Sequence, residues 1–192
     1  MIAVDFGFGN VKYYFLKNGI EEVKGILPSY IVEQNGKVIM GENALKLGKV
    51  GKVYTATTVE DLINLYPKVL RYLSEKVMYD RDVAVGLPLS AWQVEKIRLM
   101  LAEKLFENGY YPRVYPQCAS VGFVYSGGLV IDFGFNTVIA CLVESGNILY
   151  NKTYYQSGAV ALAKQVEKEL DYLTALSGRT ITKQELGVAI MS

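Results

Sequence analysis

The chain has 192 residues, of which 51% are hydrophobic and 20% charged, so it can bury a core and lacks the composition of a disordered chain. Its 20 basic residues almost balance 19 acidic ones, which gives no support for broad charge-driven binding of nucleic acid or membranes. There is no histidine, which excludes Ser-His-Asp triads, Cys-His pairs and ordinary zinc sites. The length fits one domain of ordinary size or two small ones.

The chain shows no targeting signal. No basic segment precedes a long apolar run at the N-terminus, and no stretch of about 18 uncharged apolar residues occurs. Two cysteines are too few for a disulfide framework, so Cys118 and Cys141 are predicted to be buried free thiols. These features predict a soluble cytoplasmic protein.

The first segment of the chain is repeated later in the sequence. Residues 2–19 align with residues 129–146 at a constant offset of 127, and both segments contain the run DFGF. Asp5 thereby matches Asp132, and Gly7 matches Gly134. Two copies at this separation indicate two related domains rather than a solenoid, whose repeats are about 20–50 residues long.

Each copy is predicted to form a three-stranded antiparallel meander. An apolar run ends in the aspartate, a glycine-containing turn follows, and a second β-rich run comes after it. The expected strands are 2–6, 11–16 and 21–27 in the first copy, with a turn at Asn18-Gly19, and 129–133, 137–143 and 148–155 in the second.

Between the two meanders the pattern alternates helices and strands. Asn35-Gly36 predicts a hairpin in a small inserted subdomain at about 28–57. A capping box at Thr57 and Glu60 predicts a helix to residue 77, kinked or broken at Pro67. A strand at 83–87, a helix capped by Ser90 and Gln93 that stops at Gly109, a strand at 113–115 and a helix at 117–125 follow. After the second meander a helix is expected at 158–176 with Leu162 inward, and another from Thr182.

The two Asp-Phe-Gly turns carry the predicted chemistry. A tight turn directs several backbone N–H groups one way, and glycine lets the backbone approach phosphate oxygens closely. A carboxylate at the end of the preceding strand can hold Mg²⁺. Gln117, which lies between the copies, can orient a water for attack on a phosphoryl group. Two such turns facing across a cleft would grip one polyphosphate from both sides.

Several neighbouring residues allow more than one interpretation. Lys12 can reach phosphate or lie on a solvated strand face, and Asn10 can contact phosphate or simply favour the turn. The fifteen tyrosines fit core and sheet-face positions better than a base-stacking platform.

This order of motifs resembles the superfamily of actin, heat-shock chaperone and sugar-kinase ATPases, most closely its ParM-type actin-like branch. The segment Asp5-Phe6-Gly7-Phe8-Gly9-Asn10-Val11-Lys12 is similar to the first phosphate motif, D-x-G-x-x-N-x-K. Pro116-Gln117 with Ala119 and Gly122 is similar to the first connecting helix, and Asp132 to Thr137 to the second phosphate motif, D-x-G-x-x-T. Gln156-Ser157-Gly158, which opens the next helix, also fits the order.

The resemblance implies roles for individual residues. Asp5 and Asp132 would organise Mg²⁺ and, with Gln117 directing the water, form the catalytic set. The phosphates of ATP or GTP would lie against Gly7, Gly9, Asn10, Lys12, Gly134, Asn136, Thr137 and Gly158. Ile139 departs from the pattern, because ParM relatives often have an acidic residue there.

The resemblance also implies an α/β fold of the RNase H-like type. Residues 1–116 would form a βββαβαβα domain with its inserted subdomain, 117–128 the connecting helix, and 129–192 the incomplete start of a second such domain. The adenosine-binding motif and second connecting helix of the family are expected beyond this length, so nucleotide binding would be impaired and the chain alone would turn over little or no ATP. The sheet edge at 129–133 would then be exposed.

Three functions remain open at this point. The first is a nucleotide-dependent, filament-forming ATPase in plasmid segregation or cytoskeletal scaffolding, in truncated or short form. It would associate with itself as a filament or dimer, through the exposed sheet edge of 129–133, and with an adaptor protein, but not directly with nucleic acid or membrane. The second is a sugar or pantothenate-like kinase, and the third is a non-enzymatic scaffold that binds no nucleotide.

Overall fold

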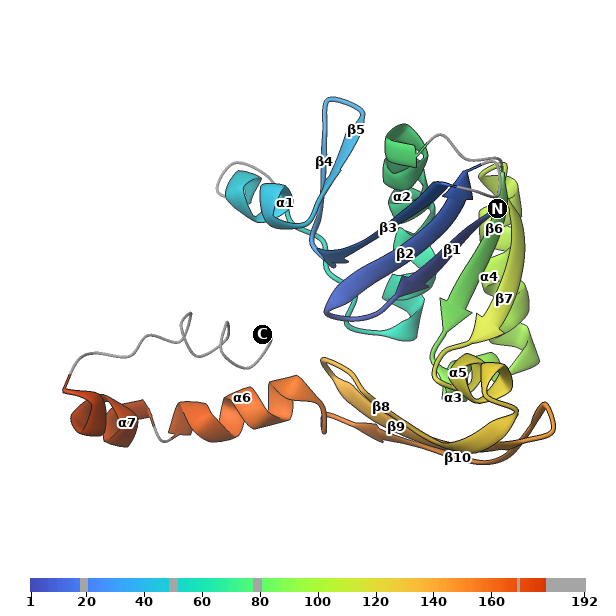
Figure 1. Cartoon of the computed structure of the whole chain (residues 1–192). Coiled ribbons are helices and arrows are strands. Elements are labelled where there is room, and N and C mark those ends of the chain that lie inside the picture. The colour runs from blue at the N-terminus through green and yellow to red at the C-terminus, as the bar shows by residue number, and fades with distance from the viewer. Residues whose placement is uncertain (18–20, 49–51, 78–80, 169, 179–192) are drawn as a thin grey trace.

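The computed structural model describes residues 1–17, 21–48, 52–77, 81–168 and 170–178. Its larger part is a five-stranded mixed sheet in the order β3-β2-β1-β6-β7 (Figure 1). The strands are β1 (Ile2–Phe6), β2 (Asn10–Lys17), β3 (Glu21–Pro28), β6 (Asp82–Leu87) and β7 (Tyr111–Pro116). The first three form the predicted antiparallel meander, and β6 and β7 join β1 in parallel. The predicted turn at residues 18–19 lies outside the described residues.

One face of this sheet is covered by helices α2 (Val59–Val77) and α4 (Glu95–Glu107). Alternate residues of β1 and β6, among them Ile2, Val4 and Val83, are buried against Leu70 and Leu101 of the helices. The opposite face carries Asp5 and its neighbours. The alternation therefore places Asp5, and Lys12 opposite it on β2, on the face that the helices do not cover.

The start of α2 differs by one residue from the predicted capping box. Thr58 Oγ1 accepts the Asp61 N–H at 3.1 Å, and Asp61 Oδ2 accepts the Thr58 N–H at 2.9 Å. The prediction of Thr57 with Glu60 was wrong, because both pairs have the same spacing and Asp61 also binds Thr57. The helix runs without a break through Pro67, which lies well inside it.

The residues between β3 and α2 form a hairpin and a short helix. Strands β4 (Ile31–Gln34) and β5 (Lys37–Met40) pair around Asn35 and Gly36, which both have positive φ, as the sequence predicted. Helix α1 (Glu42–Leu47) follows and was not predicted. Ile31, Val38 and Met40 join the main core, so the hairpin is anchored beside the sheet.

The predicted cap at Ser90 and Gln93 was also wrong. Ser90 lies inside the short helix α3 (Leu89–Trp92), and its hydroxyl pairs with the Tyr155 hydroxyl at 2.8 Å. Helix α4 begins later, at Glu95, without a side-chain cap, and ends as expected near Gly109, whose φ is +83°. Ser90, which the local pattern assigned to a helix cap, therefore makes a long-range contact instead.

The second sheet has three strands in the order β10-β9-β8, joined to the first by helix α5 (Ala119–Val124). The strands are β8 (Gly127–Phe133), β9 (Thr137–Glu144) and β10 (Asn147–Tyr155). Figure 1 shows α5 between the two sheets. Pairing in the two hairpins is the same at the offset of 127: Asp5 lies opposite Lys12, and Asp132 lies opposite Ile139. The sequence repeat is therefore a structural repeat.

The chain beyond β10 is helical over the span predicted for one helix, apart from residue 169, which lies outside the described residues. Helices α6 (Ala159–Lys168) and α7 (Leu170–Ser177) extend away from the second sheet (Figure 1). Leu162, predicted to face inward, is 50% exposed, because the helix is not packed on that sheet. The predicted helix start at Thr182 lies outside the described residues. Within the described ranges, no helix combines the length and apolar character needed to cross a membrane.

Candidate functional site

The two Asp-Phe-Gly turns have the same backbone geometry. The Gly7 N–H donates to the Asn10 carbonyl at 2.9 Å, and the Gly134 N–H donates to the Thr137 carbonyl at 2.9 Å. In each turn, one backbone N–H is therefore occupied by the hydrogen bond that closes the turn. Because Gly7 and Gly134 are equivalent at the offset of 127, both copies of the repeat end their first strand in one kind of loop.

A cavity of about 140 Å³ lies between the two turns. It brings together nine of the eleven predicted site residues: Asp5, Gly7, Gly9, Asn10, Lys12, Gln117, Asp132, Gly134 and Thr137. The remaining two predicted residues, Asn136 and Gly158, do not line it. Segments that lie more than a hundred residues apart in the sequence thus meet around one polar space.

Asp5 is the best-surrounded carboxylate of the site. Lys12 on the neighbouring strand places its Nζ 3.8 Å from one carboxylate oxygen, and Gln117 donates its Nε2–H to the other. Burial raises the pKa of Asp5 above its usual value, Lys12 opposes this shift, and the charge of Asp132 adds to it. Asp5 and Asp132 both line the smaller cavity, so two like charges face the same space.

Gln117 is held by a strained turn at the junction of the two sheets. Its N–H donates to the Leu87 carbonyl of the first sheet at 2.8 Å. Cys118 then adopts φ +69° and ψ −58°, and the Ala119 N–H donates back to the Gln117 carbonyl at 2.8 Å, which makes a γ-turn of the rare positive-φ kind. Such strain persists only where the surrounding structure fixes it, and here Cys118 and Ala119 are packed in the core cluster beside the second sheet.

Cys118 and Cys141 are free and buried, as predicted, and their sulfur atoms lie 3.5 Å apart. Burial and the neighbouring thiol raise the pKa of Cys118 to about 12. At neutral pH this residue is therefore a protonated thiol that packs α5 onto β9, and not a nucleophile.

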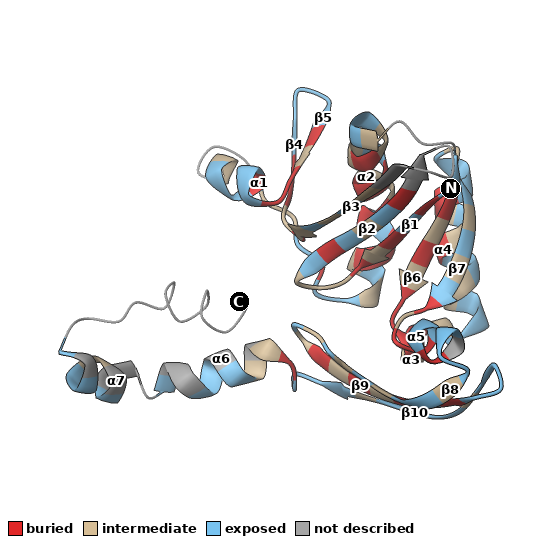
Figure 2. Cartoon of the chain, viewed as in Figure 1, coloured by how far each residue is buried: buried red, intermediate tan, exposed pale blue. Residues whose placement is uncertain are grey.

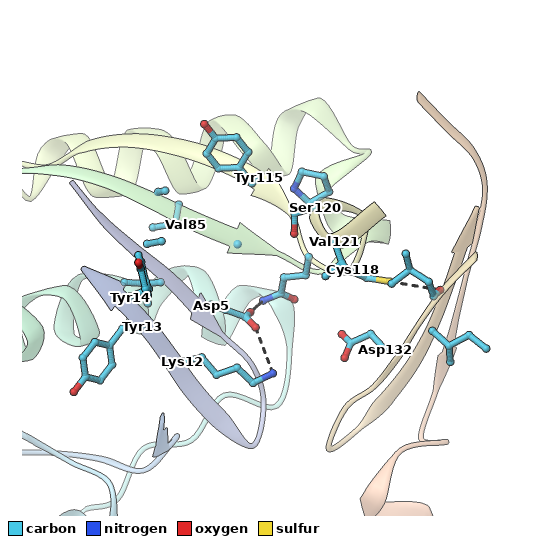
Figure 3. A pocket seen from close by; sticks show the side chains of 18 residues that line it. Asp5, Lys12, Tyr13, Tyr14, Val85, Tyr115, Cys118, Ser120, Val121 and Asp132 are labelled. Atoms are coloured by element: carbon cyan, nitrogen blue, oxygen red, sulfur yellow. Dashed lines mark hydrogen bonds and ion pairs between the residues drawn. The ribbon is translucent and has the colours of Figure 1, made fainter. Parts of the chain in front are cut away.

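Asp132 faces the first sheet from β8, as Figure 3 shows. Ile139, 2% exposed, stands opposite it in the hairpin, where Lys12 stands opposite Asp5. The two hairpins thus share geometry but not charge. Asp5, Lys12, Gln117 and Asp132 also border a second cavity of about 570 Å³, which opens on the uncovered face of the first sheet.

Three residues that support the site were not recognised in the sequence. Ser29, 2% exposed, donates its hydroxyl to the Gly7 carbonyl at 2.8 Å, and Tyr66 of α2 donates to the Gly86 carbonyl at 2.7 Å. A Cβ at Gly86 would lie 2.9 Å from Cγ of Gln117, so glycine leaves the room that this side chain needs. Each is a single residue of a common type, and no local pattern distinguishes it.

The turns also contact each other directly. A Cβ at Gly9 would lie 2.6 Å from Cβ of Phe135, so the tip of the second turn rests on the first. Gly158 supports the second turn from behind, because Ala159 N–H donates to the Gly134 carbonyl at 3.1 Å and any Cβ at Gly158 would collide with that carbonyl. Gly158 is thus close to the turn without lining the cavity.

The donor types around the smaller cavity fit phosphate oxygens and a hard divalent cation. Two carboxylates suit Mg²⁺, whereas an ammonium group, a carboxamide and glycine-rich backbone suit phosphate. No group of three or more Asp, Glu, Cys or His side chains gathers anywhere in the described part of the chain. A cation here would accordingly be held by the two aspartates together with water and ligand oxygens.

Comparison with known proteins identifies the architecture. No protein-family model matches the chain, and neither does any curated protein. Among solved structures, MreB5 of Spiroplasma citri bound to ADP superposes with a TM-score of 0.67 at 19% identity, and MreB5 of the same organism bound to AMPPNP with 0.67 at 18%. Each match covers 97% of this chain, which spans 60% of the length of either structure. At this level of identity the likeness concerns architecture, and the chain is therefore a protein of the actin-like fold.

Proposed function

We propose that the paired turns bind the phosphate groups of a nucleotide with Mg²⁺, as part of an actin-like, filament-forming ATPase. The observation that carries the proposal is the symmetry of the cleft: two turns with the same hydrogen bond and strand register bring Asp5 and Asp132 to one polar cavity. The nucleotides bound in the two MreB5 structures agree with it.

The residues of the site have distinct proposed roles. Lys12 would neutralise phosphate charge, and the turn glycines would admit the phosphate oxygens to close contact. Because Gln117 donates its Nε2–H to Asp5, its Oε1 is the atom that would accept a hydrogen bond from the attacking water. Asp5 and Asp132 would hold Mg²⁺, which would supply positive charge to offset that of the phosphates. By the resemblance to ParM-type proteins, nucleotide would close the two domains and hydrolysis would weaken filament contacts.

The size of the cavity predicts which part of the nucleotide is held. The space between the turns, about 140 Å³, lies below the roughly 300–1,000 Å³ of typical small-ligand pockets, so this part of the cleft suits phosphates better than a whole nucleotide. The adjoining cavity of about 570 Å³ is not lined by the turn glycines Gly7, Gly9 and Gly134. Inorganic triphosphate with Mg²⁺ should therefore raise the melting temperature about as much as ATP with Mg²⁺, a few degrees at saturation. A large rise with ATP and none with triphosphate would contradict this assignment.

A non-enzymatic scaffold is the second candidate, and one observation favours it. Phe135 rests on Gly9, so the two turns already touch across the cleft. If the cleft is only architectural, neither ATP nor triphosphate will change the melting temperature. Light scattering with and without ATP then separates nucleotide-dependent filaments from association that ignores nucleotide.

A further inference from the structure

Ser29 binds the first Asp-Phe-Gly turn from behind with two hydrogen bonds. It lies between β3 and β4, in the segment that leads from the first sheet into the hairpin, and is 2% exposed (Figure 2). Its hydroxyl donates to the Gly7 carbonyl at 2.8 Å, and its N–H donates to the Gly9 carbonyl at 3.0 Å. Both glycines line the smaller cavity, whereas Ser29 does not. One buried residue therefore holds both glycine carbonyls of the turn on the side away from the cavity.

The second turn has the corresponding carbonyl occupied by a different donor. Gly134 matches Gly7 at the offset of 127, and its carbonyl accepts the Ala159 N–H at 3.1 Å. The residue that matches Ser29 is Gln156, whose φ of +54° turns the chain toward α6, so a backbone amide takes the place of the hydroxyl. The same bond thus occurs in both turns although its donors are unrelated, which indicates that the geometry of the turn requires it.

The bound carbonyl of Gly7 determines where the next amide points. The peptide bond between Gly7 and Phe8 is trans, so its carbonyl and the Phe8 N–H point in opposite directions. Because the carbonyl is bound to Ser29 behind the turn, the Phe8 N–H is directed to the opposite side, where Phe8 borders the cavity. A backbone amide directed in this way is a donor for a phosphate oxygen.

Without the Ser29 hydroxyl, the peptide between Gly7 and Phe8 would be free to rotate. Glycine adopts many backbone conformations, so a flip of this peptide meets little steric resistance at Gly7. The flipped peptide would present a carbonyl oxygen to the cavity that Asp5 and Asp132 already line, and this oxygen would repel phosphate. In the second turn the equivalent flip would break a bond to the backbone of α6. The first turn is therefore the one whose orientation depends on a side chain.

We propose that Ser29 is a positioning residue, which keeps the Phe8 N–H of the first turn directed at a phosphate oxygen without touching the ligand itself. The proposal rests on the proposed phosphate-binding function and adds to it the group that orients one of its backbone donors. A purely structural role is the alternative, because a buried hydroxyl needs a partner wherever it lies. Positioning depends on the hydroxyl and changes the affinity for the ligand, whereas a structural role changes only the free energy of unfolding.

The test is isothermal titration calorimetry of the full chain with Mg²⁺ and inorganic triphosphate. Ser29→Ala should weaken binding by about 10-fold, because a charge-assisted hydrogen bond to phosphate is lost. Ser29→Thr keeps the hydroxyl and should restore the affinity to within about threefold of the wild type. In NMR spectra, the Phe8 amide proton should shift on ligand binding in the wild type and in Ser29→Thr, and much less in Ser29→Ala.

Two control variants separate positioning from a general loss of stability. Ser74→Ala removes another bond between a hydroxyl and a backbone carbonyl, which Ser74 makes to Arg71 at 2.7 Å in α2, away from the cavity. Ile97→Ala removes part of the packing of α4 against the core. Both controls should bind triphosphate with the affinity of the wild type, even where urea denaturation shows a lower free energy of unfolding. Circular dichroism checks that each variant is folded.

The results that would overturn the positioning role differ from the result that would overturn the proposed function. If Ser29→Ala binds triphosphate as tightly as the wild type, Ser29 does not position the turn, and the proposed function stands. Equal weakening in Ser29→Ala and Ser29→Thr would show that the turn does not need the hydroxyl. Equal weakening in Ser29→Ala and Ile97→Ala would reduce the role of Ser29 to stability. A wild type that binds no triphosphate would overturn the proposed function and the positioning role together.

Discussion

The charge of Asp5 lowers the stability of the fold, at a position that the proposed function requires. Its pKa is raised chiefly by burial, even though 45% of its side chain remains exposed, and Lys12 offsets only part of that shift. The native protein therefore holds a proton on Asp5 more tightly than the unfolded chain does. Ionising Asp5 therefore costs the folded protein stability, at the position where a cation would bind.

We predict that Asp5→Asn raises the melting temperature at pH 7. A raised folded-state pKa means that the contribution of Asp5 to stability is greatest below the unfolded value near 3.8 and is lost as the pH rises through the folded value. The gain from Asp5→Asn should therefore shrink as the pH is lowered toward 4. Thermal melts between pH 4 and 8 measure it, with exposed Asp82→Asn as the control. A destabilised variant at pH 7 would show that the ion pair outweighs burial.

Gly158 should tolerate no side chain, although its backbone conformation is ordinary. A Cβ there would meet the Gly134 carbonyl and would lie 2.8 Å from the carbonyl carbon of Phe135. We expect Gly158→Ala to lower the free energy of unfolding by about 2–3 kcal/mol, measured by urea denaturation. Gly146→Ala, where φ is +77° but the space is open, should cost only about 1 kcal/mol. Equal costs at the two positions would contradict the packing seen behind the second turn.

At the scale of elements, the start of α2 allows the observed capping box to be compared with the one predicted from the sequence. Asp61 accepts hydrogen bonds from the backbone N–H of Thr57 and Thr58, which lower its pKa. Asp61→Ala should therefore cost about 1 kcal/mol at pH 7, and Glu60→Ala less than about 0.5 kcal/mol. Because a lowered pKa stabilises only above the unfolded value, the cost should fade as the pH drops through the folded pKa. Urea denaturation at pH 7 and pH 3 measures the cost of both substitutions. A larger cost for Glu60→Ala than for Asp61→Ala would support the capping box predicted from the sequence.

Tyr66 joins α2 to the strands that carry the site. Its hydroxyl donates to the Gly86 carbonyl and accepts the Phe6 N–H at 3.3 Å, in a fully buried position. We expect Tyr66→Phe to cost about 1–3 kcal/mol, because buried backbone groups of β1 and β6 lose their partner. Tyr72→Phe on the same helix is the matched control and should cost less than about 0.5 kcal/mol. Chemical denaturation measures both, and a neutral Tyr66→Phe would mean that water replaces the hydroxyl.

Most elements were predictable because their patterns are local. The alternation in 2–6 and the Asn35-Gly36 turn both occur as expected, since strand faces and positive-φ turns depend on neighbouring residues. The cap at Ser90 failed because its hydroxyl binds Tyr155, a residue 65 positions away. The expected inward face of Leu162 failed because an amphipathic pattern does not say which surface the helix meets.

At the scale of the whole molecule, the internal repeat was the most informative feature of the sequence. An ungapped offset of 127 implied that both turns fold alike, and the pairing of Asp5 with Lys12 and Asp132 with Ile139 confirms it. The repeat could not indicate the contact of Phe135 with Gly9 or the strained turn at Cys118, because both arise where two different copies meet. The sequence therefore predicted the halves of the site better than their junction.

The central claim is that both turns bind one ligand together. The most direct measurement is the rise in melting temperature caused by Mg²⁺ and triphosphate in the wild type, Asp5→Asn, Asp132→Asn and the double variant. If the two aspartates hold one ion, each single variant should lose most of the rise and the double variant little more. Equal rises in all four proteins, or losses that simply add, would contradict a shared site.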